Sequence, residues 1–278
     1  MLRVGDLHLH SFYSDGEHSI NSLKDLSRKA GLDFIAITDH DTLDHFTDKS
    51  ISSSDTLEII KGVEISTIEN EIDYHIIGYF VSPENEDLKN LIHNLSIFRD
   101  ERIRIMIENL AKKGIELFFE EVQNKTRKDF LSRNLIAEVL LDKGYIKSIP
   151  EAFTFDFIGN TSESYLRGFS VSPAKVINII HFAGGVAILA HPGNTPGRTE
   201  VVGMQELTML KDFGLDGLEV FQPKHSLEDI KRFVCQANLL NLTITGGSDF
   251  HGKYSPEIQL GMVRLPEKYL EALKKLKQ

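Results

Sequence analysis

Short apolar runs in this chain repeatedly end in histidine, aspartate or glutamate, and this pattern constrains the fold more than any other feature. The runs 34–37 and 186–190 lead into Thr38-Asp39-His40-Asp41 and His191-Pro192-Gly193. Apolar runs of this length between helical segments are typical of strands in an α/β sheet. Because the carboxyl ends of such strands meet at one edge or one barrel mouth, we expect these ionisable side chains to lie together.

Strand and helix patterns alternate in both end regions of the chain. Strands are predicted over residues 3–10, 34–38, 57–65, 73–80, 185–190, 217–221 and 242–245. Helices are predicted over residues 19–30, 173–182, 204–213, 226–239 and 266–277. Such alternation favours a parallel sheet with right-handed crossovers, and 278 residues suffice for one α/β barrel with an insertion.

The middle of the chain follows a different pattern. Residues 87–113 form one long stretch with apolar side chains at helical spacing, which ends at Gly114. No convincing strand follows before residue 169. We therefore predict a barrel built from residues 1–99 and 169–278, interrupted by a small helical insertion over residues 100–168.

Charge and apolar runs argue against two classes of partner. The formal net charge of −10 is unsuited to binding a long nucleic-acid duplex, which needs a basic face. A small anionic substrate remains possible, because bound divalent cations reverse the sign locally. No apolar run approaches the roughly 18 residues of a membrane span and no secretory signal is visible, so we expect a cytoplasmic protein without membrane contact. The only cysteine, Cys235, is predicted to be a small buried residue.

The clearest metal-ligand spacing is His8-Leu9-His10 in the first predicted strand. Residues two apart project from the same face of a strand, so both imidazoles share one side with Asp6. Two imidazoles on one rigid face form half of a metal site, although a plain polar face is the alternative. Asp15 follows the strand in a Ser-Asp-Gly turn, where an ordinary turn residue is the alternative.

Other donor candidates lie in apolar surroundings, where an ionisable side chain is costly unless it is paired or binds a metal. His40 is the candidate ligand after the second strand, with Asp39 as a neighbour that orients it. Glu64 sits in an apolar run, where a salt bridge is the alternative. His75 interrupts another such run, where a hydrogen-bonded core histidine is the alternative.

The C-terminal half repeats the pattern. His191 follows a strand directly, and Asp249 and His251 repeat the two-residue spacing of the opening motif. His225 also follows a strand and is a candidate substrate contact. The remaining histidines have no companion ligand and are assigned to the surface or the core: His18, His45, His93 and His181.

The order of these motifs resembles the PHP (polymerase and histidinol phosphatase) family over about residues 1–82 and 170–260. The motifs are His8-Leu9-His10 with Asp15, Thr38-Asp39-His40, Gly62-Val63-Glu64, His75, Ala190-His191-Pro192-Gly193 and Ser248-Asp249-Phe250-His251-Gly252. The resemblance implies a distorted seven-stranded (β/α) barrel with a three-metal cluster at its C-terminal mouth.

Three ligand sets are implied by the resemblance, position by position. The first is His8, His10, Glu64 and Asp249; the second is His75 and His191, with Glu64 bridging; the third is Asp15, His40 and His251. Nitrogen and oxygen ligands without thiolate suit zinc, manganese or iron, so two or three such divalent ions are expected as cofactors.

Within the family, the chain is most similar to stand-alone phosphoesterases that act on nucleotides, a group that includes 5'-3' exoribonucleases. In this group a helical insertion contributes to the substrate pocket. The implied activity is hydrolysis of a phosphate ester by a metal-activated hydroxide, in a nucleoside monophosphate, a 3',5'-bisphosphate or the end of a short RNA. Arg133 and Arg198 are candidate phosphate clamps, with a solvated surface arginine as the alternative for each.

The chain departs from this group at two places near the expected phosphate contacts. It reads Arg133-Asn134-Leu135 where the group often has Arg-Pro-His, and Asn194 where the group often has arginine. Alternatives are a histidinol-phosphate phosphatase on the same fold, an amidohydrolase-type C–N hydrolase on a similar barrel, and a metal-bound scaffold. The usual bridging lysine of amidohydrolases has no evident counterpart here, whereas Glu64 fills a bridging role. The complete ligand set argues against a scaffold.

Overall fold

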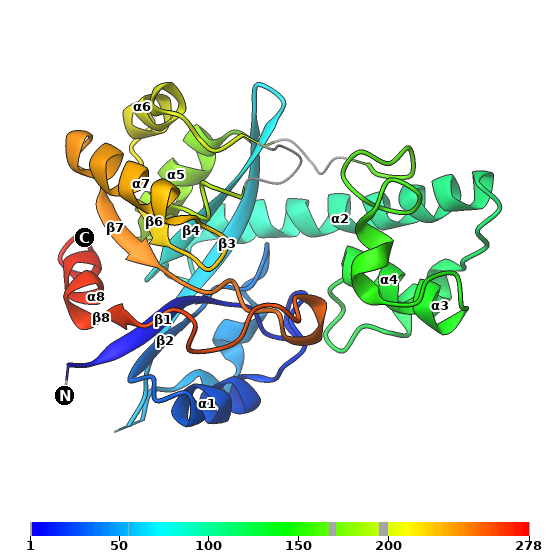
Figure 1. Ribbon diagram of the computed structural model, residues 1–278, viewed down its shortest axis with the longest axis horizontal. Helices are drawn as coiled ribbons and strands as arrows, with labels where there is room; N and C mark the ends of the chain where they lie inside the picture. The colour runs from blue at the N-terminus through cyan, green and yellow to red at the C-terminus, as the bar shows by residue number, and fades with distance from the viewer. Residues whose placement is uncertain (1, 55, 167–170, 195–199, 278) are drawn as a thin grey trace.

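The sheet of the molecule curls into a nearly closed barrel, with most helices packed around it (Figure 1). The computed structural model describes residues 2–54, 56–166, 171–194 and 200–277. In this part of the chain the strands follow the order β7-β6-β5-β4-β3-β2-β1-β8. The predicted distorted α/β barrel is thereby confirmed, with a short eighth strand added at one edge.

Most strands and helices begin and end close to their predicted bounds, although β3 extends to Glu69 instead of residue 65, and no bounds were predicted for α3, α4 or β8. The strands are β1 (Val4–Leu9), β2 (Phe34–Ile37), β3 (Glu58–Glu69), β4 (Ile72–Tyr79), β5 (Val186–Leu189), β6 (Gly217–Phe221), β7 (Thr243–Gly246) and β8 (Leu265–Pro266). The helices are α1 (Ile20–Lys29), α2 (Glu86–Lys112), α3 (Phe119–Gln123), α4 (Arg133–Asp142), α5 (Pro173–Phe182), α6 (Met204–Asp212), α7 (Leu227–Leu239) and α8 (Glu267–Lys274). Side-chain caps at Ser19, Asn85 and Ser172 accept backbone N–H bonds and fix three helix starts.

The sheet is not parallel throughout, so the prediction of a parallel sheet was wrong at β4, and the short β8, which was not predicted, also pairs antiparallel, with β1. β4 pairs antiparallel with both β3 and β5. No helix separates β3 from β4, and the two residues between them, Asn70 and Glu71, adopt left-handed φ angles of 49° and 63°. A connection this short permits only an antiparallel hairpin. The hairpin places Ser66 opposite His75 and so brings His75 beside Glu64.

The end of β1 and the segment after β7 meet at the barrel mouth. The segment after β7 pairs with the end of β1 through a parallel bridge between Leu9 and Phe250. The backbone N–H of His10 donates to the carbonyl of Phe250 at 3.1 Å, and that of Asp249 donates to the carbonyl of His8 at 2.9 Å. This pairing brings the first and last predicted ligand motifs side by side.

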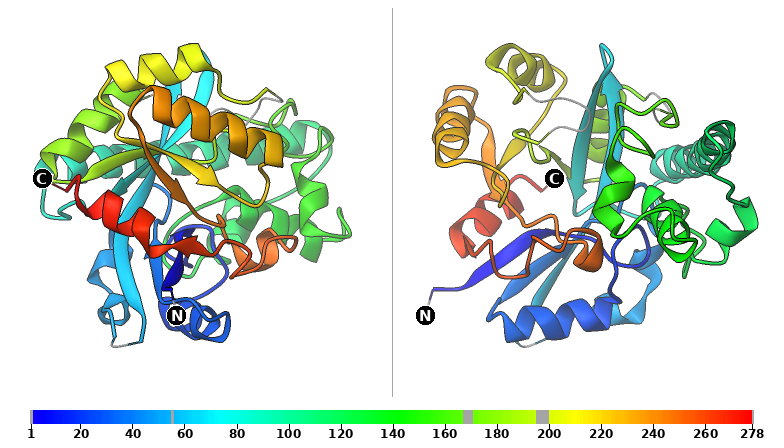
Figure 2. Two further views of the ribbon diagram at one scale, coloured as in Figure 1. Left: turned by 60° about the vertical axis from the view of Figure 1, so that its left-hand side comes forward. Right: turned by 45° about the vertical axis from the view of Figure 1, so that its right-hand side comes forward.

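A separate hydrophobic cluster holds the helical part together. Its buried members run from Ile103 to Ile158, and α2, α3 and α4 lie together beside the barrel (Figure 2). α2 spans 27 residues and passes residues 99 and 100 without interruption. The division of the chain into barrel and insertion at this point therefore stays a prediction.

The exposure of Cys235 on α7 differs from its prediction. Cys235 is exposed, which corrects the prediction of a buried thiol. The rotation of α7 about its axis explains this exposure, because the buried face of the helix carries Phe233, Gln236 and Ala237, and Cys235 lies off that face.

Among the described residues, no helix combines the length and the apolar character needed to cross a membrane.

Candidate metal centre

Glu64 lies at the centre of the predicted ligands. Five histidine nitrogens surround its two oxygens: His8 Nε2, His10 Nε2 and His40 Nδ1 lie 3.1 Å from Oε2, and His75 Nδ1 and His191 Nε2 lie 3.0 Å from Oε1. The side chain of Glu64 is fully buried. Burial alone would raise the pKa of this carboxyl, but the histidines around it hold that pKa well below its usual range. Glu64 is therefore an anion with both oxygens turned toward imidazoles.

Two further carboxylates extend the cluster on the side of His10. Asp249 Oδ1 lies 3.2 Å from His10 Nε2, and Asp15 Oδ1 lies 3.1 Å from His251 Nε2. The rings of His10 and His251 stack with their centroids 4.1 Å apart. All nine residues predicted as metal ligands thus lie in one continuous cluster at the barrel mouth.

Three groups within this cluster place their donor atoms within 4.8 Å of one another. They are His8, His10, Glu64 and Asp249; then His10, Asp15, His40 and His251; then His40, Glu64 and His75. The first group equals the first set implied by the family resemblance, and the second adds His10 to the third set. His191, which the resemblance places beside His75, lies on the same oxygen of Glu64 as His75 does.

The donor chemistry of the cluster fits divalent metal ions. His8 Nε2 and His10 Nε2 lie 3.0 Å apart and face the same side of Glu64. A divalent cation held by His8 and His10 would satisfy the lone pairs of both nitrogens. Imidazole and carboxylate ligands without thiolate suit zinc, manganese or iron.

Glu219 orients two of the histidines and was missed as a site residue in the sequence. Its side chain is fully buried in β6. One oxygen accepts from His8 Nδ1 at 3.0 Å, and the other accepts from the backbone N–H of His191 at 2.8 Å. A donor at Nδ1 leaves Nε2 of His8 with its lone pair toward Glu64. The signal was present, because Glu219 is a carboxylate inside an apolar run, as Glu64 is.

Asp39 holds the loop that carries Asp15. Its carboxylate accepts from the backbone N–H of Ser11 at 2.7 Å and from the hydroxyls of Ser11 and Ser14 at 2.6 Å each. His45, assigned from the sequence to the surface or the core, is fully buried with Nδ1 at 3.3 Å from Asp39. Asp39 therefore positions a ligand loop, whereas the sequence suggested that it orients His40.

Three of the eight described non-glycine residues with positive φ angles lie at strand ends of this site. Asp41, His191 and Asp249 have positive φ angles of 45°, 28° and 58°. A non-glycine residue in this region costs on the order of 1–3 kcal/mol and persists only where surrounding contacts enforce it. Two of these three residues are predicted metal ligands, so the strain coincides with the donor cluster.

Gly247 allows the chain after β7 to pass directly against His8. A Cβ atom at this position would lie 2.2 Å from His8 Cβ and 2.5 Å from the backbone nitrogen of His8. We expect Gly247→Ala to displace His8, to lower the free energy of unfolding by about 1–3 kcal/mol and to reduce bound metal. Chemical denaturation and metal analysis measure the two effects. Gly203→Ala is the control, since the nearest atom there is 3.5 Å away. Unchanged metal content in Gly247→Ala would contradict the expected displacement.

A cavity of about 150 Å³ opens from the cluster toward the helical part. Its lining includes His40 and His75 together with three arginines, Arg99, Arg102 and Arg133. Arg133 Nη1 donates to Asn160 Oδ1 at 2.6 Å. Burial, with the positive charge of Arg102, lowers the pKa of Arg133 to about 10, so Arg133 is still a cation at neutral pH. Arg133 therefore lies where a phosphate clamp is expected, and phosphate binding by it stays a prediction.

The other two predicted substrate contacts have different outcomes. Arg198 lies outside the described residues. His225 Nδ1 donates to the carbonyl of Val220 at 2.8 Å, and its Nε2 accepts from the backbone N–H of Gly193 at 3.0 Å. The ring thus fastens the loop after His191 to the end of β6. A contact between His225 and substrate stays a prediction.

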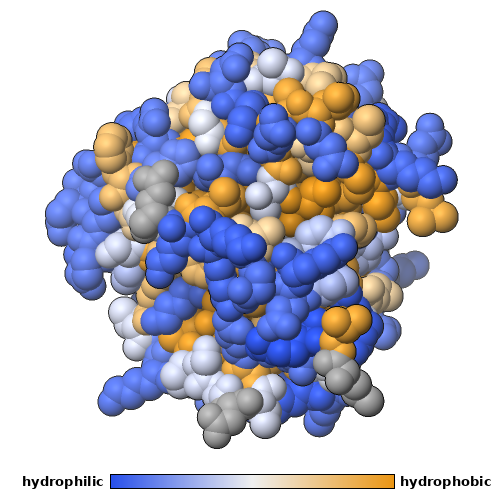
Figure 3. Space-filling model, turned by 90° about the vertical axis from the view of Figure 1, so that its left-hand side faces the viewer, coloured by the Kyte–Doolittle hydropathy of each residue, from blue (hydrophilic) through white to orange (hydrophobic). Residues whose placement is uncertain are grey.

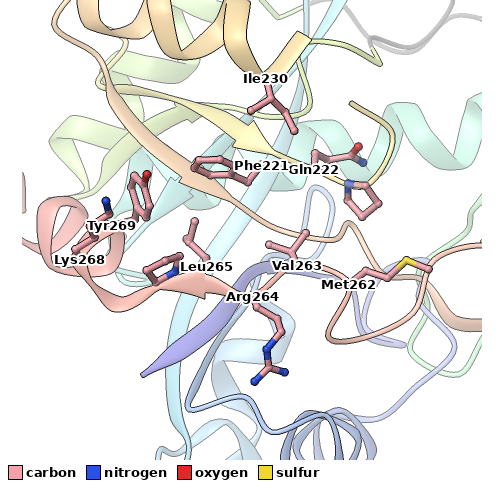
Figure 4. A pocket seen from close by; sticks show the side chains of 11 residues that line it. Phe221, Gln222, Ile230, Met262, Val263, Arg264, Leu265, Lys268 and Tyr269 are labelled. Carbon is pink, nitrogen blue, oxygen red and sulfur yellow. The ribbon is translucent and has the colours of Figure 1, made fainter. Parts of the chain in front are cut away.

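A larger cavity lies elsewhere in the described part of the molecule. The side of the barrel that carries α6, α7 and α8 is partly hydrophobic, as Figure 3 shows. A cavity of about 400 Å³ lies between β6, β8 and α8 and is lined by Phe221, Val263, Leu265 and Tyr269, among others (Figure 4). None of the nine predicted metal ligands lines it. Its size alone therefore does not make it the catalytic site.

Comparisons with known proteins agree with the motifs. A family model described as "PHP domain" matches residues 6–168. A 3',5'-nucleoside bisphosphate phosphatase of Chromobacterium violaceum is 29% identical over 252 residues, which cover 88% of this chain and 86% of the relative. The 5'-3' exoribonuclease Rnm of Escherichia coli is 28% identical, with 93% and 88% covered. A phosphoribosyl 1,2-cyclic phosphate 1,2-diphosphodiesterase of Eggerthella lenta is 27% identical, with 95% and 99% covered.

Solved structures share the whole fold. A candidate metal-dependent phosphoesterase from Bifidobacterium adolescentis superposes with a TM-score of 0.89 at 28% identity, covering 97% of this chain and 94% of that one. A Chromobacterium violaceum protein described as an amidohydrolase, with bound sulfate and no metal, gives a TM-score of 0.82 at 27% identity, with 96% of each chain covered. The family model spans more than half of the residues, and its motifs are the ones gathered around Glu64, so this chain belongs to the PHP domain family.

Proposed function

We propose that this chain, a hydrolase acting on phosphoric ester bonds, removes a phosphate group from a nucleotide. The observation that carries the proposal is the convergence of five imidazoles on the two oxygens of one buried carboxylate, Glu64. The relatives support the substrate class, since their names include a nucleoside bisphosphate phosphatase, an exoribonuclease and a cyclic phosphate diesterase. The substrate is a nucleoside monophosphate, a 3',5'-bisphosphate or the end of a short RNA.

The nine clustered donors would hold two or three divalent ions, with Glu64 shared between sites. When bound, such ions neutralise charge on a phosphoryl group and lower the pKa of a water molecule. Other side chains of the protein hold the metal-ligand residues in fixed positions. Glu219 and Asp39 fix His8 and the Asp15 loop before substrate arrives, so little reorganisation is needed during the reaction.

The reaction is a hydrolysis that balances without a protein nucleophile. A water oxygen bonds to phosphorus, the bond between phosphorus and the ester oxygen breaks, and that oxygen gains a proton. The products are an alcohol and inorganic phosphate. Arg133 lines the cavity beside the cluster, which supports a role in which its guanidinium would donate N–H bonds to the non-bridging oxygens.

Arg133→Ala is expected to raise KM for phosphate-bearing substrates about 10-fold or more, with a smaller change in kcat. A hydrogen bond to a charged group contributes roughly 1.5–3 kcal/mol, which sets this magnitude. Steady-state kinetics measure it. Arg104→Ala is the matched control, because Arg104 lies on α2 over the ring of Phe119 and outside the cavity. An unchanged KM would remove Arg133 from the substrate site.

Metal removal tests the proposed function directly. Treatment with a chelator should stop phosphate release from a nucleotide panel, and added manganese or zinc should restore it. The melting temperature should fall in parallel, since a ligand present at 1,000 times its Kd contributes about 4 kcal/mol. The panel also contains histidinol phosphate and amides. Preferred hydrolysis of histidinol phosphate would make that compound, and not a nucleotide, the substrate. Hydrolysis of amides alone would contradict the proposed phosphoesterase activity.

A further inference from the structure

The cavity between β6, β8 and α8 has the size of a ligand site, although none of the nine clustered donors lines it. Its volume is about 400 Å³, and small-molecule sites in proteins commonly occupy roughly 300–1,000 Å³. The walls combine the aromatic side chains Phe221 and Tyr269 with the aliphatic side chains Val263 and Leu265 (Figure 4). Walls of this kind favour a ligand with an apolar body.

The two aromatic rings meet edge to face in the wall of the cavity. The ring centroids of Phe221 and Tyr269 lie 5.4 Å apart, with an angle of 62° between the ring planes. Both side chains are only half-buried, so part of each ring stays open to a ligand. A third aromatic ring can pack against this pair with the same edge-to-face preference, whereas an alkyl chain gains only from its buried area. The pair therefore favours an aromatic ligand.

Lys268 supplies a positive charge at one end of the cavity. Its ammonium lies 4.9 Å from the centroid of Tyr269, and no carboxylate of the described residues lies within ion-pair distance of it. The helix α8 begins beside it, with Pro266 as the N-cap and no hydrogen bond from a capping side chain. Glu267, the acidic residue of the first turn, is paired with Arg3. The partial positive charge of the helix start adds to that of the ammonium, so an anionic group is favoured at this end.

The other cationic side chain of the lining, Arg264, is already occupied. Its Nη1 and Nη2 donate to the carbonyls of Ala30 and Gly31, at 2.6 and 3.1 Å, at the C-terminal end of α1. A single ammonium is then left for the anion, without the guanidinium fork that commonly binds phosphate. A singly charged carboxylate matches this end better than a phosphate dianion does.

Gln222 lies at the opposite end of the cavity from Lys268 (Figure 4). Its side chain is only 3% exposed. Its Oε1 accepts from the backbone N–H of Lys224 at 2.5 Å, which fixes the orientation of the amide and leaves Nε2 as a donor. Nε2 has no hydrogen-bond partner among the described residues. A buried donor without an acceptor is unfavourable, and a carbonyl oxygen of a ligand would satisfy it.

We propose that this cavity binds a small aromatic carboxylate that carries a carbonyl group at its far end. The carboxylate lies at Lys268 and the start of α8, the ring packs against Phe221 and Tyr269, and the carbonyl accepts from Gln222 Nε2. A peptide would bring backbone amides into the apolar middle of the cavity, where the side chains offer them no partner, so a small molecule is favoured. The site is separate from the nine clustered donors, and the inference does not depend on the proposed function.

The test measures the binding of synthetic probes to the full chain by saturation-transfer NMR titration. The two-ended probes are 4-acetylbenzoate and 4'-acetylbiphenyl-4-carboxylate, which carry both end groups at two lengths. At each length, an isopropyl compound lacks the carbonyl and a carboxamide lacks the charge. At least one two-ended probe should bind with a Kd of about 1 mM or lower. Its isopropyl and carboxamide counterparts should each bind about 10-fold more weakly.

Substitutions at the two ends should each remove one preference and keep the other. Lys268→Gln should abolish the preference for the acid over the carboxamide. Gln222→Glu should abolish the preference for acetyl over isopropyl, because glutamate keeps the acceptor for the N–H of Lys224 and loses the donor. The expected change in each ratio is about 10-fold, with the other ratio changed less than about 3-fold.

A substitution in the wall tests the location of the probe without altering either end. Ile230→Trp should fill the cavity and weaken the binding of every probe at least about 10-fold. Lys275→Gln is the matched control for Lys268→Gln, because Lys275 lies at the other end of α8 and does not line the cavity. It should leave every Kd unchanged.

Three results would overturn the inference. The first is that neither two-ended probe binds at up to about 10 mM. The second is equal affinity for acid and carboxamide at both lengths. The third is binding that neither Lys268→Gln nor Ile230→Trp changes, since the probe then lies elsewhere on the protein. Turnover enters none of these measurements, so the phosphoesterase activity stands or fails separately.

Discussion

Glu64→Gln is expected to remove most of the bound metal and to lower kcat/KM for phosphate release by roughly 10³-fold. Glutamine keeps the shape of the side chain but has one oxygen and no charge. In the native protein both oxygens of Glu64 lie 3.0–3.1 Å from imidazole nitrogens, so the amide cannot serve both halves of the cluster. Metal content by mass spectrometry and steady-state kinetics measure the two losses.

Glu58→Gln is the matched control for this substitution. Glu58 begins the same strand, β3, and pairs with Arg3 and Lys274 away from the barrel mouth. The Glu58→Gln variant should keep wild-type metal content and turnover. The double variant His10→Ala with Glu64→Ala should lose both. Normal metal content and rate in Glu64→Gln would remove this carboxylate from the centre of the site.

The donor cluster was predictable because strand geometry is regular. Residues two apart on a strand share a face, which predicts that His8 and His10 lie together, as they do beside Glu64. The strand ends of a barrel meet at one mouth, so His40 and His191, which each follow a strand, were expected to lie close together. Both contact Glu64 in the structure. The bounds of α5 agree with the predicted 173–182, since Ser172 and Pro173 mark the start of a helix clearly.

Strand direction and the orienting contacts were less accessible from sequence. An apolar run does not reveal whether its strand is parallel, and the short connection after β3 was the only clue that β4 is reversed. Glu219 reaches His8 across 211 positions of sequence, and no local pattern specifies such a partner. The bonds from Ser11 to Asp39 likewise depend on how two strand ends approach each other.

The sequence also did not reveal which arginines of α2 face the cavity beside the donor cluster. Helical periodicity predicted the helix but not which of its charged residues face the donor cluster. Arg102 faces the cavity, whereas Arg104, two residues later, is exposed over Phe119. A rotation of about 200° separates residues two apart on a helix, so only the packing of α2 against the barrel decides this assignment.

Glu219→Gln is expected to lower metal affinity and kcat/KM about 10- to 100-fold, because the amide weakens the bond that orients His8. The defect should differ in kind from that of Glu64→Gln. Glu219 contacts no other predicted ligand side chain than His8, so excess metal should restore much of the rate in Glu219→Gln and little in Glu64→Gln. Glu228→Gln, at an exposed position in the first turn of α7, is the control. A rate in Glu219→Gln that does not respond to metal would mean that Glu219 acts on substrate or on the fold and not through His8.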